Sequence, residues 1–252
     1  MSAALVAASD VPPVIAMLGV VTVLAVVQSL FGVGLLLFGT PIFLLLGLPF
    51  GQVLSYLLPC SIVVSALQVA TSGGLTLEPI RRQFLAITAP AVLVATGVAL
   101  ALGTPHHVRL IVGIVLLLTA VTRVGRLQAV LRRTVRKRSR PLMLLLGVVH
   151  GWSNLGGGIL TVIVGASFDD KTSIRRHIAF AYGSMALIQL SVVIATARPH
   201  LVVGLWLLLP VIAGSVFLLI GQQVFEKARQ RPYQLGLTAL IVSFGAMLVG
   251  TA

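Results

Sequence analysis

The stretch His150–Thr161 reads HGWSNLGGGILT and lies inside an apolar run from Pro141 to Phe168. A continuous spanning helix would not hold Gly156, Gly157 and Gly158 together at its middle, because each glycine weakens a helix by about 1 kcal/mol relative to alanine. The stretch therefore predicts a broken helix. Backbone groups freed by a break at membrane depth must be satisfied by protein or by a water-filled cavity, so such breaks tend to line transport sites.

A weaker stretch of the same kind, QSLFGVGLLLFGTP at Gln28–Pro41, lies in the first half of the chain. Each stretch opens a series of four apolar segments, and one span of a bilayer needs roughly 20 such residues. The segments are Val14–Gly47, Val53–Thr71, Phe84–Gly103 and Leu110–Thr122 in the first series, and Leu142–Phe168, Ile178–Ala197, Leu201–Gly221 and Leu235–Val249 in the second. The basic stretch Arg123–Arg140 joins the two series and reads as a linker.

The composition sets the class of protein. Hydrophobic residues make up 58% of the 252 residues, charged residues make up 9%, and the mean hydropathy is +1.10. These values exclude a soluble globular domain and predict an all-α polytopic membrane protein surrounded by the lipid bilayer. The net charge of +13 would suggest a nucleic-acid partner in a soluble chain. Cationic loops held on the cytoplasmic side of a membrane give the same imbalance, so we expect no nucleic-acid binding.

Three further features of the sequence give little information about function. The single cysteine, Cys60, lies in an apolar run and is expected to pack as a small core residue. The adjacent His106 and His107 have no cysteine or carboxylate nearby, so we expect no metal site and no cofactor. No basic residue precedes the apolar residues of the N-terminus, so we expect no cleaved signal peptide.

The first segment of each series is too long for one ordinary span, so it is either a single crossing or a hairpin that returns to its starting face. Loops rich in Lys and Arg stay on the cytoplasmic side. Single crossings place eleven of the 18 basic residues there, whereas hairpins place sixteen there and leave only Arg109 and Arg198 outside. The count predicts two inverted repeats, each a broken-helix hairpin followed by three transmembrane helices, with both termini outside. The first repeat is 1–122 (hairpin 14–47), the linker 123–140 and the second repeat 141–252 (hairpin 141–168).

The hairpin tips are expected to lie near the middle of the bilayer and to bind an anion rather than a cation. The outgoing arms, Leu35–Gly47 and Ile159–Phe168, are roughly 15 to 20 Å long, about half a bilayer. A half-helix that begins at mid-depth points unpaired N–H groups and the positive end of its dipole at the gap. No carboxylate lies in the predicted core, since the five are in tails or loops: Asp10, Glu78, Asp169, Asp170 and Glu226. A cation site would need such a group.

The predicted substrate-binding residues are those of the two turns: Gln28, Ser29, Gly32, Gly34, His150, Ser153, Asn154, Gly156, Gly157 and Gly158. Other interpretations stay open, because small residues such as Ser29 and Ser153 pack helices together, and buried His150 and Asn154 can tie helices to one another. Trp152 either walls the site or only packs. His150 is the only titratable side chain predicted near mid-depth, so we expect a proton as a candidate coupling partner.

A charged cluster follows the second hairpin. Lys171, Arg175 and Arg176 lie there beside Asp169, Asp170 and His177. The cluster either anchors the topology or forms a gate or anion-attracting vestibule.

The two turns resemble a known family. The first reads Gly32-Val33-Gly34-Leu35-Leu36 and is followed by Pro41, and the second reads Asn154-Leu155-Gly156-Gly157-Gly158 with no later proline. Two such halves around a basic loop, covering Val14–Val249, resemble the sulfite exporter TauE/SafE family of bacterial membrane transporters. The resemblance implies a secondary transporter in the bacterial inner membrane that exports a small sulfur-containing anion of the sulfite and sulfonate class. A homodimer is a candidate assembly.

Two other functions compete with this interpretation. A glycine-lined gap between hairpins could also conduct as an anion channel. An intramembrane serine hydrolase would use Ser153 as nucleophile with His150 or His177 as base. His150 lies on the same turn as Ser153 rather than on a facing helix, so the geometry of a hydrolase is missing and we expect no enzyme activity.

Overall fold

The computed structural model describes residues 3–74, 79–102, 114, 117–118, 133, 135, 137–196 and 202–250, and the regular structure of these residues is helical throughout. The first half contains α1 (Ala3–Phe31), α2 (Leu35–Leu45), α3 (Phe50–Thr71) and α4 (Pro79–Leu102). The second contains α7 (Ser139–Ser153), α8 (Gly157–Ser167), α9 (Lys171–Thr196), α10 (Val203–Val216), a π-helical turn (Phe217–Gly221), α11 (Gln222–Lys227) and α12 (Gln230–Gly250). His106, His107, Arg198 and most of the fourth apolar segment and of the linker lie outside the described residues.

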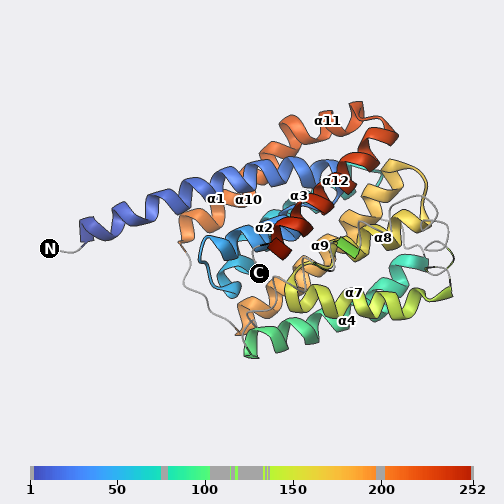
Figure 1. The fold of residues 1–252 in the computed structure, drawn as a ribbon, viewed down its shortest axis with the longest axis horizontal. Coiled ribbons are helices and arrows are strands. Elements are labelled where there is room, and N and C mark those ends of the chain that lie inside the picture. The colour runs from blue at the N-terminus through green and yellow to red at the C-terminus, as the bar shows by residue number, and fades with distance from the viewer. Residues whose placement is uncertain are drawn as a thin grey trace.

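Both predicted breaks occur in an all-helical membrane bundle (Figure 1). Among the described residues, five helices are long and apolar enough to cross a membrane, and α2 and α8 are apolar but shorter. The prediction of an all-α polytopic membrane protein is therefore confirmed. The same order of a broken pair followed by longer helices is present in both halves, although the placement of the repeats and the side of the membrane that each faces stay predictions.

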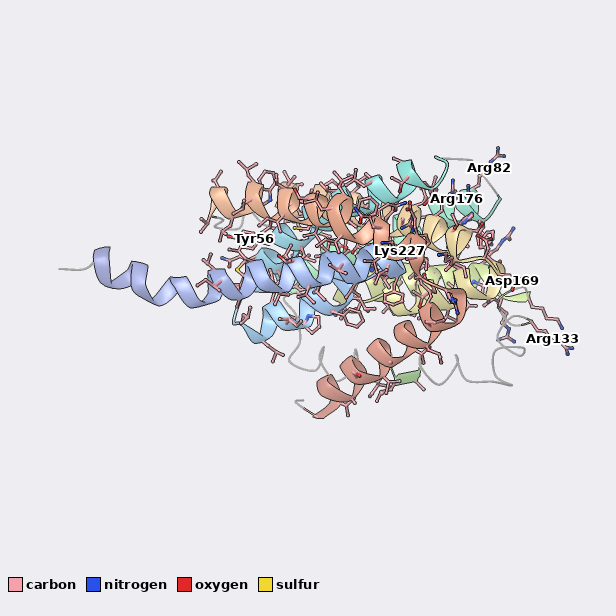
Figure 2. The ribbon with its side chains drawn as sticks, turned by 90° about the horizontal axis from the view of Figure 1, so that it is seen from above. Tyr56, Arg82, Arg133, Asp169, Arg176 and Lys227 are labelled. Carbon is pink, nitrogen blue, oxygen red and sulfur yellow. The ribbon has the colours of Figure 1, made fainter. Side chains whose placement is uncertain are left out.

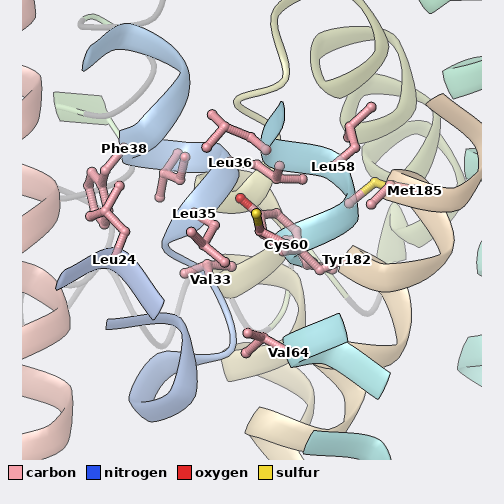
Figure 3. Packing of buried hydrophobic residues seen from close by; sticks show 14 of the residues in the cluster. Leu24, Val33, Leu35, Leu36, Phe38, Leu58, Cys60, Val64, Tyr182 and Met185 are labelled. Atoms are coloured by element: carbon pink, nitrogen blue, oxygen red, sulfur yellow. The ribbon is translucent and has the colours of Figure 1, made fainter. Parts of the chain in front are cut away.

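Each broken pair folds back on itself. The α-carbon of Gly34, at the start of α2, lies so close to α1 that an added Cβ would stand 2.7 Å from the Gln28 nitrogen. Phe38, one turn into α2, lies beside Leu24 of α1 (Figure 3). In the second pair, Ser139 at the start of α7 and Asp169 after α8 line one cavity of about 490 Å³. The second pair thus returns to the end of the bundle from which it began, as a hairpin does.

Close helix packing holds the two halves together. Gly147 and Gly151 of α7 face α4, where an added Cβ would stand 2.7 Å from the carbonyl oxygens of Thr88 and Val92, respectively. The Thr88 hydroxyl donates to the Met143 carbonyl at 3.0 Å. Small residues permit this approach of two backbones, which is the usual basis of helix association in membranes.

A second contact between the halves is an antiparallel one between α3 and α9. Gly183 of α9 lies against the Ser65 side chain of α3, with an added Cβ 3.0 Å from the Ser65 Cβ. Toward the end of α3, Arg175 Nη2 donates to the Ser72 hydroxyl at 3.1 Å. The second half of α3 therefore packs against the middle of α9. The first hairpin contacts both helices, through Gln28 at Ser65 and through Gly32 at Ile178.

Charged residues gather at one end of the bundle. Figure 2 shows Arg82, Arg133, Asp169 and Arg176 there, while Tyr56 lies toward the other end. A single-crossing arrangement would separate Arg82 from Arg176, so this grouping favours the hairpin interpretation.

Cysteine accessibility tests which end is cytoplasmic. In a Cys60→Ser background, we expect Lys171→Cys and Arg229→Cys to react with an impermeant maleimide only after cells are opened, because both belong to the basic end. Arg198→Cys is the matched control and should react in intact cells. Labelling of position 171 or 229 from outside would contradict the predicted topology.

Candidate functional site

The first break is a tight turn around Gly32, whose φ of 78° is readily adopted only by glycine. The Gly32 N–H donates to the Gln28 carbonyl at 2.8 Å. An added Cβ at Gly32 would also stand 2.8 Å from Ile178 Cγ2 of α9. The turn is thus pressed between its own hairpin and the second half of the protein.

Gln28 closes the start of α2. Its Oε1 accepts a hydrogen bond from the Leu35 N–H at 3.1 Å, so it satisfies one of the N–H groups that a helix start leaves free. Its Nε2 lies 3.1 Å from the Ser61 hydroxyl and 3.2 Å from the Ser65 hydroxyl. Gln28 is therefore fully used within the protein, as a polar tie between α1, α2 and α3.

The second break uses asparagine where the first uses glycine. Asn154 has a φ of 63°, in the left-handed region that asparagine tolerates better than most residues. Its N–H donates to the His150 carbonyl at 2.7 Å, as the Gly32 N–H does to Gln28. Its Nδ2 donates to the Thr40 hydroxyl of α2 at 2.7 Å. The second tip is tied directly to the first hairpin.

The two tips meet. An added Cβ at Gly157, the first residue of α8, would stand 3.3 Å from Val33 Cγ1 in the first turn and 3.1 Å from the Tyr182 hydroxyl. The Tyr182 ring lies close to Leu35 and Leu36 at the start of α2 (Figure 3). The two helix starts therefore converge, as the sequence predicts.

Polar atoms at this meeting point lack partners. His150 and Tyr182 are fully buried, with ring centroids 5.7 Å apart. Among the described residues, no hydrogen-bond partner is found for either His150 ring nitrogen, the Tyr182 hydroxyl, Asn154 Oδ1 or Gln189 Oε1. Buried polar groups are nearly always hydrogen-bonded, so such a group is a place where a ligand or water is expected.

The serines of the two turns bond within their own helices. Ser29 Oγ donates to the Ala25 carbonyl at 2.6 Å, and Ser153 Oγ donates to the Val149 carbonyl at 2.7 Å. These contacts favour the packing interpretation over ligand binding for both residues. Trp152 is partly buried against the core.

The start of α9 is anchored by two charged residues. Asp170 Oδ1 accepts from the Ser173 N–H at 2.7 Å. Slight burial opposes ionisation of this carboxyl, but hydrogen bonds from Ser173 and its neighbours outweigh it and hold the pKa of Asp170 below its usual value. Lys171 Nζ donates to the carbonyls of Phe225 and Ala228 at 2.8 and 2.6 Å, so it caps the end of α11.

Arg175 contacts the first break and is buried, with 1% of its surface exposed. Its Nη1 donates to the Ser29 carbonyl at 3.3 Å and to Gln222 Oε1 at 3.0 Å. The guanidinium also stacks 3.5 Å from the centre of the Phe225 ring. Arg176 is half-buried. The gate or vestibule role of Lys171, Arg175 and Arg176 stays a prediction.

Tyr182 is the residue that the sequence did not single out. It is one of three tyrosines and lies within the apolar segment Ile178–Ala197. A polar hydroxyl inside an apolar helix was the available signal, because buried tyrosine hydroxyls usually find a partner.

The comparisons with known proteins identify a family. Residues 16–248 match the sequence model of a family described as sulfite exporter TauE/SafE. Neither the curated proteins nor the solved structures gave a match.

Proposed function

The chain belongs to the sulfite exporter TauE/SafE family, and we propose that it carries a small sulfur-containing anion of the sulfite and sulfonate class out across the bacterial inner membrane. Membership makes it a membrane transporter, and several of its apolar helices are long enough to cross the bilayer. The substrate class, the direction of transport and the site between the helix breaks are the proposed part.

One observation carries the proposal: two helix starts meet at Val33 and Gly157. Beside them lie the buried His150 and Tyr182, whose ring nitrogens and hydroxyl form no well-aligned hydrogen bond among the described residues. Helix starts and hydrogen-bond donors attract anions. The carboxylates whose side chains the structure describes, Asp169, Asp170 and Glu226, are exposed and lie outside the two breaks. A cation would find no counter-charge among these residues at the breaks, whereas an anion would find donors.

Efflux from cells tests the substrate class. We expect a strain lacking the protein to accumulate at least one of sulfite, thiosulfate, sulfoacetate and taurine, and the wild-type gene to restore efflux. The Gly157→Val gene, which changes the proposed site, should not restore efflux at equal membrane abundance. Equal retention of all four anions with and without the protein would contradict the proposed substrate class.

Proton coupling at His150 has its own test. Histidine is the side chain whose charge ordinarily changes between pH 5 and 8, and Tyr182 faces the His150 ring. We expect His150→Gln to flatten the dependence of transport rate on pH over that range and to slow transport about tenfold or more. An unchanged rate and pH profile would mean that His150 is a structural tie only.

The competing functions are less well supported. The Ser153 hydroxyl is hydrogen-bonded to a backbone carbonyl of its own helix rather than to an imidazole, which does not suit a hydrolase nucleophile. A channel shares the same helix breaks, and saturable countertransport is the property that distinguishes a carrier from it. A homodimer stays a candidate assembly.

A further inference from the structure

The two breaks share a frame of hydrogen bonds. At each, the N–H of the left-handed residue, Gly32 or Asn154, donates to the carbonyl of the residue four positions earlier. A glutamine from a neighbouring helix reaches the same carbonyl: Gln68 Nε2 lies 2.7 Å from the Gln28 oxygen, and Gln189 Nε2 lies 3.2 Å from the His150 oxygen. Corresponding positions in the two halves can therefore be paired through these contacts.

By this correspondence, Gln28 in the first half is equivalent to His150 in the second. Ser61 is equivalent to Tyr182, because they lie seven residues before Gln68 and Gln189, respectively. In the first half the two side chains bond to each other, because Gln28 Nε2 donates to the Ser61 hydroxyl at 3.1 Å. Gln28 Oε1 accepts from the Leu35 N–H. In the second half neither the His150 ring nitrogens nor the Tyr182 hydroxyl forms a well-aligned hydrogen bond among the described residues, although the Gln189 side chain lies beside the His150 ring.

The Tyr182 hydroxyl lies between the two helix starts. Its oxygen would be 3.1 Å from a Cβ added at Gly157 of α8, and it stands beside the backbone N–H of Leu37 in α2 without forming a well-aligned hydrogen bond. The side chain is fully buried. A buried hydroxyl aimed at the start of a helix and left without a partner is explained by a ligand that supplies the missing contact.

We propose that the two breaks are unequal and that one oxyanion per chain binds at the second break. The Tyr182 hydroxyl and a ring N–H of His150 donate to the anion's oxygens, and the N–H groups of the first residues of α8, Gly157 and Gly158, complete its surroundings. At the first break the Gln28 amide oxygen already occupies the place of the anion. This inference rests on the proposed function and adds Tyr182 as a recognition residue.

A matched pair of tyrosine variants tests the proposal. The full-length protein in nanodiscs carries Trp206→Phe, so that Trp152, which adjoins the second break, is its single tryptophan. Sodium sulfite and sulfoacetate are titrated against Trp152 fluorescence and by calorimetry. We expect Tyr182→Phe to weaken binding roughly tenfold or more, the usual effect of losing one hydrogen bond to a charged ligand. Tyr56→Phe should bind as wild type, because the Tyr56 hydroxyl accepts from the Val202 N–H at 3.0 Å, away from the breaks.

The outcomes separate this inference from the proposed function. Equal affinity in the two tyrosine variants, or two anions bound per wild-type chain, would overturn the unequal site while leaving the transporter intact. Thermal unfolding checks for a merely structural role: Tyr182→Phe should not lower the melting temperature of the anion-free protein, because the lost hydroxyl had no partner. A lower melting temperature with unchanged affinity would also overturn the inference. Failure of the wild type to bind either anion would instead count against the proposed function.

Discussion

Gly157→Val is expected to raise the Kd for the transported anion more than a hundredfold in protein that still folds. The new Cβ would stand 3.1 Å from the Tyr182 hydroxyl and 3.3 Å from Val33 Cγ1, in the space where the two helix starts meet. The two neighbours are side chains, so a shift of a few tenths of an ångström accommodates the Cβ, but the branched side chain then fills the place of the anion. Valine is a better helix former than glycine, so a weakened helix does not explain the loss.

The matched control is Gly165→Val. Gly165 lies in the same helix, and an added Cβ there would meet nothing within 4 Å. Both variants are compared by anion titration and by thermal unfolding, and only Gly157→Val should lose binding. Wild-type affinity in Gly157→Val would mean that the break serves helix packing and that the anion binds elsewhere.

Gly34→Val is expected to damage the fold rather than binding alone. Its Cβ would stand 2.7 Å from the Gln28 nitrogen and 3.0 Å from the Leu24 carbonyl oxygen, both backbone atoms of α1. The hairpin must open to relieve these contacts, at a cost of about 3 kcal/mol or more. We expect the melting temperature to fall by roughly 6 to 12 °C, measured on purified protein.

Gly19→Val is the control for this second variant. Gly19 is an earlier residue of α1, and an added Cβ there would meet nothing within 4 Å. It should keep the wild-type melting temperature. Equal stability of Gly34→Val and Gly19→Val would show that α2 does not return along α1 as closely as described.

The sequence was sufficient for the breaks because glycine acts locally. Gly32 and the run Gly156 to Gly158 weaken a continuous helix, and the breaks lie at Gly32 and directly before Gly157. The uneven distribution of basic residues favoured hairpins over crossings. Asn154 was predicted as a ligand, and its left-handed φ of 63° and its bond to Thr40 give it a structural task as well.

The sequence was insufficient for contacts made across the bundle. Gln28 was predicted to bind substrate, and that stays a prediction. What the sequence does not show is that its amide oxygen accepts from the Leu35 N–H while its Nε2 lies beside the Ser61 hydroxyl of α3. In the sequence Arg175 is one member of the charged cluster after the second hairpin, and the structure surrounds it with Ser72, Gln222 and Phe225 from other parts of the chain. Tyr182 gains its significance only when α9 crosses the two helix starts, and no local pattern marks that crossing.

Counterflow in proteoliposomes tests the central claim most directly. Vesicles loaded with unlabelled sulfite, or with the anion that the efflux assay selects, are diluted into a trace of the ³⁵S-labelled anion. A carrier with one site between the helix breaks predicts transient accumulation of label that saturates with concentration, is present in Gly165→Val and is absent in Gly157→Val. Flux that neither saturates nor accumulates label, or counterflow that persists unchanged in Gly157→Val, would contradict the account.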